Sequence, residues 1–114
     1  MVDPGQASVS AGPAWVRGHT YITVQGFAAG SGDDAEQAQA FLAEHGVDTA
    51  IIPLTGGLRL LVTTQGYNHN DPAQRHLNDE LNLLVRSLGL VYRKAGGRYN
   101  WDDTYFRKLE SDSW

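Results

Sequence analysis

The side chains that could perform acid–base or metal chemistry do not assemble into a familiar site. The histidines are His19, His45, His69 and His76. None of these has the spacing to a second ligand that zinc sites use, and the chain has no cysteine. Carboxylates are paired at Asp33–Asp34 and Asp102–Asp103, but neighbouring residues usually point in different directions. The sequence therefore predicts a protein that is not an enzyme and that needs no metal or cofactor.

Polar and aromatic side chains alternate along two strand-like segments, 20–27 and 58–65. Successive strand residues point to opposite sides, so the odd-numbered residues of each segment are expected to share one face. If the two strands pair, the candidate ligand-binding residues form one surface: Tyr21, Thr23, Gln25, Arg59, Leu61, Thr63 and Gln65. An aromatic ring, a guanidinium group, amides and hydroxyls together suit a sugar-like ligand.

The elements that must position this surface follow from turn and capping signals. The expected order is strand 20–27, helix 33–45, strand 47–52, strand 58–65, helix 71–95 and strand 105–109. Asp33 and Asp71 are good N-cap residues for the two helices. Gly89 costs the second helix about 1 kcal/mol relative to alanine and could end it early. Tyr99 and Trp101 are expected to fold back over the open end of the core.

Both expected helices carry apolar residues along one side only, so each needs an apolar surface to cover. A four-stranded sheet with alternating faces offers one such surface. The predicted fold is therefore α+β, a two-layer βαββαβ ferredoxin-like sandwich with both helices on one face of a four-stranded sheet. The opposite face is predicted to stay open to water or to a ligand.

Composition narrows the class of partner. The formal net charge is −4 at pH 7, whereas a nucleic-acid binder usually has an excess of Lys and Arg, so no nucleic acid is expected. The sequence contains no apolar run long enough to cross a membrane, so membrane contact by this segment itself is not expected. Residues 1–17 are interpreted as a flexible leader or linker, 18–110 as the domain and 111–114 as a C-terminal tail. Trp15 and Val16 are expected to make the first anchored contacts.

Several short motifs in this element order resemble the SPOR domain, the sporulation-related repeat of bacterial envelope proteins. The motifs are V-Q-G-F at 24–27, A-E-Q-A at 35–38, G-V-D-T at 46–49 and G-L-R-L-L-V at 57–62. The likeness covers residues 20 to 109. The segments 61–67, 96–99 and 105–108 are similar to a divergent bacterial SPOR-like branch whose members often have an N-terminal membrane anchor.

The resemblance implies binding of peptidoglycan, with a preference for glycan strands stripped of stem peptides, through the open face of the sheet. Arg59 matches the basic residue that the family has on its third strand. Thr23 and Gly26 stand where the family has glutamine and serine, and Gln25 would substitute from the same face. The implied location is the bacterial cell envelope or periplasm for an anchored parent protein, while a cytoplasmic location stays open.

Two other functions fit the same pattern. In the first, the open sheet face or a strand edge docks a protein partner or a second copy of the chain. The exposed position expected for Leu61, beside Tyr21, favours this alternative. In the second, the face binds RNA, which requires aromatic residues on the central strands. Tyr21 is the one residue there that qualifies, and the acidic net charge argues against RNA.

Overall fold

A computed structural model of the chain describes residues 15–110 and residue 114. The elements run in the order β1 (Thr20–Phe27), α2 (Asp34–Glu44), β2 (Thr49–Pro53), β3 (Arg59–Thr63), α3 (Pro72–Lys94) and β4 (Tyr105–Lys108). A 3₁₀ turn over Thr55–Gly57 joins β2 to β3. The order is the predicted one, and the largest differences are that β2 starts two residues later and β3 ends two residues earlier than predicted.

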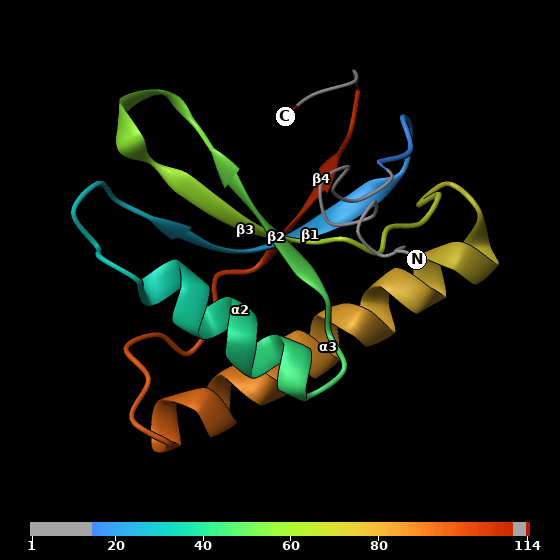
Figure 1. Ribbon diagram of the computed structural model, residues 1–114. Coiled ribbons are helices and arrows are strands. Elements are labelled where there is room, and N and C mark those ends of the chain that lie inside the picture. Colours follow the sequence, from blue (N-terminus) through green and yellow to red (C-terminus); the bar gives the residue numbers. More distant parts are fainter. Residues whose placement is uncertain (1–14, 111–113) are drawn as a thin grey trace, which may run out of the picture.

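The strands form one antiparallel sheet in the order β2-β3-β1-β4. Both helices lie on the same side of this sheet, with α2 against β2 and β3 and α3 against β1 (Figure 1). The sheet and its two helices confirm the predicted two-layer α+β ferredoxin-like sandwich. The predicted leader falls mainly on residues 1–14, which lie outside the described residues.

The two helices start differently. The Asp71 side chain accepts a hydrogen bond of 3.1 Å from the backbone N–H of Ala73, with Pro72 in the first turn, as predicted for an N-cap. Asp33 occupies the N-cap position of α2 but makes no capping hydrogen bond to the backbone. Glu36, in the first turn of α2, bonds to a side chain of β3, which is described with the site. The start of α3 is thus stabilised by its own capping residue, whereas the start of α2 is stabilised by contacts with other elements.

The core between the helices and the sheet is closed by aromatic rings from the segment after α3. Trp101 is almost fully buried and stacks on Tyr92, with ring centroids 4.6 Å apart. Tyr99 packs edge-on against Phe27 at 5.1 Å. Burial among these rings raises the pKa of the Tyr92 phenol above its usual value, and the charge of Asp34 adds to the effect. The prediction that Tyr99 and Trp101 close the core is confirmed.

Candidate functional site

The sheet face opposite the helices is apolar, which corrects the prediction of a polar surface there. Tyr21, Leu60, Val62 and Leu109 are buried on this face and form a second hydrophobic cluster. The side chains that partly cover the cluster are Trp15, Ile52, Leu54 and Trp114. Both faces of the sheet are therefore packed against apolar groups, and the expected open platform of amides and hydroxyls does not form.

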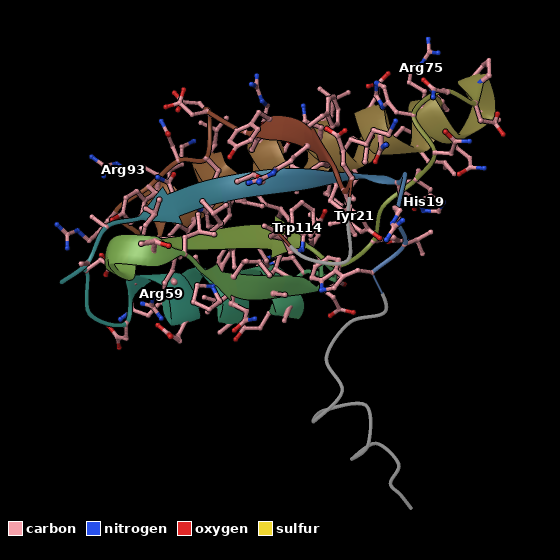
Figure 2. The ribbon with its side chains drawn as sticks, turned by 90° about the horizontal axis from the view of Figure 1, so that it is seen from above. His19, Tyr21, Arg59, Arg75, Arg93 and Trp114 are labelled. Carbon is pink, nitrogen blue, oxygen red and sulfur yellow. The ribbon has the colours of Figure 1, made fainter. Side chains whose placement is uncertain are left out.

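Three aromatic rings from distant parts of the chain meet on this face. Trp15, Tyr21 and Trp114 make edge-to-face contacts with centroid distances of 5.0 to 5.4 Å. The Tyr21 hydroxyl accepts a hydrogen bond of 2.8 Å from the backbone N–H of Val16. The Arg107 guanidinium lies 5.5 Å from the centre of the Trp114 ring and donates to the Trp114 carbonyl oxygen. Figure 2 shows Tyr21 and Trp114 close together over the sheet, away from Arg59. Trp15, which the sequence assigns to the leader, and Trp114 of the tail thus pack on the domain.

A β-bulge in β1 separates the predicted site residues of that strand. Tyr21 and Thr23 face away from the helices as expected, but both are buried, and Thr23 pairs with Val62. The register then shifts between Thr23 and Gln25. An extra residue in one strand reverses the side on which later residues lie. Gln25 consequently lines a polar pocket of about 290 Å³ beside Arg98, so its predicted place next to Thr23 was wrong.

The alternation predicted for β3 was also wrong. Leu61 is fully buried in the core beneath the helices, while Leu60 and Val62 face the other side. Arg59 pairs with Phe27, whose ring lies in the helix-side core, and Thr63 lines a pocket together with residues of α3. The segment from Leu58 to Val62 is apolar at both parities except for Arg59. Because both sheet faces are covered, polarity alone could not indicate which parity faces the helices.

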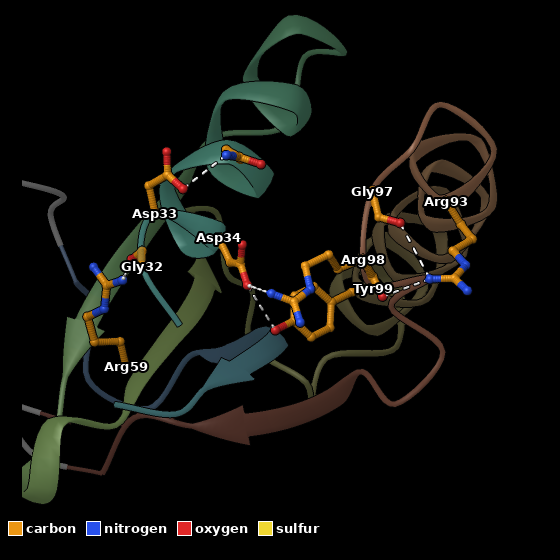
Figure 3. A network of polar contacts seen from close by, with 9 residues as sticks. Gly32, Asp33, Asp34, Arg59, Arg93, Gly97, Arg98 and Tyr99 are labelled. Atoms are coloured by element: carbon orange, nitrogen blue, oxygen red, sulfur yellow. Dashed lines mark hydrogen bonds and ion pairs between the residues drawn. The ribbon is translucent and has the colours of Figure 1, made fainter. Parts of the chain in front are cut away.

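Arg59 binds the start of α2 and does not point to a ligand surface. One guanidinium nitrogen lies 2.6 Å from a carboxylate oxygen of Glu36, and the other donates a 3.0 Å hydrogen bond to the Gly32 carbonyl oxygen. The bond from Arg59 lowers the pKa of the Glu36 carboxyl below its usual value. Arg59 therefore joins β3 to the loop before α2 and to its first turn, with Gly32 visible beside it in Figure 3.

A second polar contact joins the other side of the α2 N-terminus to the segment after α3. Asp34 is nearly buried, and one of its carboxylate oxygens accepts bonds from Arg98 at 3.2 Å and from the Tyr99 hydroxyl at 3.3 Å (Figure 3). Arg93 donates to the backbone carbonyl oxygen of Arg98 at 3.0 Å. These contacts hold the segment 97–101 against the N-terminus of α2, and they pair the charge of Arg98 with that of Asp34.

Replacing Arg59 by alanine is expected to lower Tm by a few degrees at most at pH 7, because an ion pair whose Glu36 side chain is half exposed contributes little. The lowered pKa of Glu36 means that this contribution is present above the unfolded-state pKa of the carboxyl and is lost as pH falls through the folded-state pKa. In thermal unfolding experiments from pH 7 to pH 3, the Tm values of wild type and Arg59→Ala should therefore approach each other as the pH falls. Glu36→Gln is the matched control and should match Arg59→Ala at pH 7. A difference in Tm between wild type and Arg59→Ala that stays the same at all pH values would contradict this account.

A pocket of about 510 Å³ opens on the helix side of the sheet, between the turn after α2, the end of β3 and the middle of α3. Its lining residues are Gly46, Val47, Asp48, Thr63, Thr64, Gln65, Leu81 and Leu84. Both the backbone N–H and the hydroxyl of Thr64 donate to the Asp48 carbonyl oxygen, at 3.0 and 3.3 Å. The pocket thus has one wall fixed by hydrogen bonds and another formed by helix α3.

The pocket brings together two of the predicted site residues, Thr63 and Gln65. The Thr63 hydroxyl donates to the Gln65 carbonyl oxygen at 3.2 Å and accepts a bond from the backbone N–H of Ile22. Gln65 is exposed and also lines the pocket. Asp48 and the two leucines of α3 were missed by sequence reasoning, although α3 has more leucines than one buried stripe needs. Asp48 is the one acidic or basic side chain among the described residues that line this pocket.

Comparisons of the chain with protein-family models, with curated proteins and with solved structures find no match. Among the described residues, no helix is both long enough and apolar enough to span a bilayer. The same part of the chain contains no group of three or more His, Asp or Glu side chains placed to hold a metal ion. The site must therefore be interpreted from its own geometry.

Proposed function

We propose that this chain is a non-catalytic domain of the SPOR type that binds glycan strands of peptidoglycan in the 510 Å³ pocket between β3 and α3. The observation that carries the proposal is the meeting of a few polar groups and apolar side chains in one pocket. Pockets of several hundred cubic ångströms that combine apolar walls with a few polar groups are the usual form of small-ligand sites.

The lining of the pocket matches the chemistry of a sugar ring. Gln65 offers an amide donor and acceptor, Thr64 a hydroxyl, and Asp48 a carboxylate that can accept from ring hydroxyls. Leu81 and Leu84 offer an apolar surface for the C–H faces of the ring. A lone carboxylate favours binding over glycoside hydrolysis, because hydrolysis uses two acidic groups on opposite sides of the bond.

The proposal keeps the ligand class implied by the SPOR resemblance and changes the place where the ligand binds. The sheet face that the family would use is occupied here by the rings of Trp15, Tyr21 and Trp114. Arg59, the residue that matches the family's basic position, is bound to Glu36. Thr63 and Gln65 are the residues of the expected set that lie at the pocket.

Sedimentation with purified peptidoglycan sacculi tests the proposal directly. We expect the wild-type domain to sediment with sacculi and to bind better after an amidase has removed the stem peptides. Gln65→Ala should weaken binding roughly three- to tenfold, which corresponds to the loss of one net hydrogen bond. Because Gln65 is exposed, its replacement should leave the circular dichroism spectrum unchanged.

Gln25→Ala is the matched control, since it removes the same kind of amide from a different, smaller pocket. Arg59→Ala is a second control that should still sediment. If wild-type protein stays in the supernatant, glycan binding is ruled out. If Gln25→Ala or Arg59→Ala loses binding while Gln65→Ala retains it, the proposed place is wrong.

A further inference from the structure

Helix α3 carries an apolar stripe on the side that faces away from the sheet. Leu83 and Leu90 are 65% and 60% exposed, and Leu84 and Val91 are about half exposed. Residues seven apart lie nearly in line on a helix of about 3.6 residues per turn, so these four side chains form two parallel rows. Leu84 also lines the 510 Å³ pocket, but the other three side chains do not, and nothing in the described part of the domain covers them.

The centre of the stripe has a charge pattern that is complementary to itself. Between the two apolar rows lie Glu80, Ser87 and Lys94, again at intervals of seven residues, and the Glu80 carboxylate also contacts the exposed His76 ring at 2.9 Å. A second copy of α3 laid antiparallel across the first, with a two-fold axis at Ser87, would place each Glu80 opposite Lys94 of the other copy. The same rotation keeps each apolar row on its own side, so it places Leu83 opposite Leu90 and Leu84 opposite Val91 of the other copy. The small side chain of Ser87 at the axis lets the two helices approach closely.

We infer that the domain forms a two-fold symmetric homodimer through antiparallel pairing of α3 around Ser87. An isologous contact of this kind needs a surface that matches itself after rotation, and the order acid–small–base along the stripe provides it. From Glu80 to Lys94 the stripe is about 21 Å long at about 1.5 Å per residue. An interface of that length is small, so the dimer should dissociate on dilution. The inference does not depend on the proposed glycan binding.

Sedimentation velocity of the whole chain over a wide range of concentrations tests the dimer. The wild type should shift from monomer to dimer as concentration rises. Leu90→Glu should weaken the dimer at least about tenfold, because it places a charge against Leu83 of the other copy. Leu58→Glu, which alters an exposed leucine near β3, is the matched control and should dimerise like wild type. Leu90 does not line the 510 Å³ pocket, so this variant should still sediment with sacculi.

A charge exchange tests the orientation. Glu80→Lys should weaken the dimer, because it places lysines against each other, and adding Lys94→Glu to the same chain should restore it. Glu44→Lys, at the end of α2, is the control for the change in net charge. A chain that is monomeric at every concentration overturns the inference, as does a dimer that ignores Leu90→Glu. If the double exchange does not restore association, the antiparallel pairing is wrong. If the chain stays monomeric and binds lipid vesicles, and Leu90→Glu abolishes that binding, the stripe is a membrane contact and the dimer is overturned.

Discussion

Replacement of Gly89 by alanine is expected to destabilise the domain by at least about 2–3 kcal/mol, although alanine is the better helix former. Gly89 lies inside α3 and is buried where the segment after the helix crosses it. A Cβ atom there would overlap the Asn100 carbonyl oxygen and lie 2.6 Å from its carbonyl carbon and 3.1 Å from the Trp101 Cβ. These are largely backbone atoms, which cannot move aside without withdrawing the Trp101 ring from the core.

Urea unfolding monitored by tryptophan fluorescence measures the effect. Helix propensity alone would make Gly89→Ala stabilising by about 1 kcal/mol, so the sign of the change distinguishes the two causes. Ser87→Ala is the control, because it improves propensity two residues away at an exposed position. It should give a small gain in the free energy of unfolding. A gain for Gly89→Ala as well would show that the segment 98–101 does not cross the helix closely.

Gly89 also illustrates which parts of the fold sequence reasoning could reach. Local signals were sufficient for the order of the elements, since Asp71 and Pro72 start α3 and the turn at Thr55–Gly57 joins two strands. They showed Gly89 as a weak point of the helix, where α3 in fact continues to Lys94. The reason for the glycine is a contact with a segment eleven residues away, and helix propensity carries no information about such contacts.

The candidate site was harder to predict because it depends on which side of the sheet each residue faces. Period-two alternation assumes one polar face, and here the rings of Trp15 and Trp114 make the second face apolar. The bulge after Thr23 then changes the side on which Gln25 lies. Neither feature has a clear local signature. Thr63 and Gln65 line the pocket because they lie close to α3, and the alternation of residues along a strand gives no information about that contact.

Replacement of Leu61 by alanine is the second change with a large expected effect, a loss of about 2–5 kcal/mol in the free energy of unfolding. Leu61 has no exposed surface and packs in the core between the sheet and the helices, so the shorter side chain leaves a cavity there. Urea unfolding of Leu61→Ala measures the loss. Since small domains are stable by about 5–15 kcal/mol, the variant could be partly unfolded at physiological temperature.

Leu58→Ala provides the comparison that makes the result informative about the face of β3. Leu58 precedes the strand and is exposed, and its replacement should cost less than about 1 kcal/mol. The alternation predicted from sequence places Leu58 in the core and Leu61 at the surface, and would reverse these two values. A small loss for Leu61→Ala would place Arg59 and Thr63 on the sheet face opposite the helices, because side chains two residues apart on a strand share a side. The pocket beside α3 and the bond between Arg59 and Glu36 therefore both depend on the side of β3 that this one leucine faces.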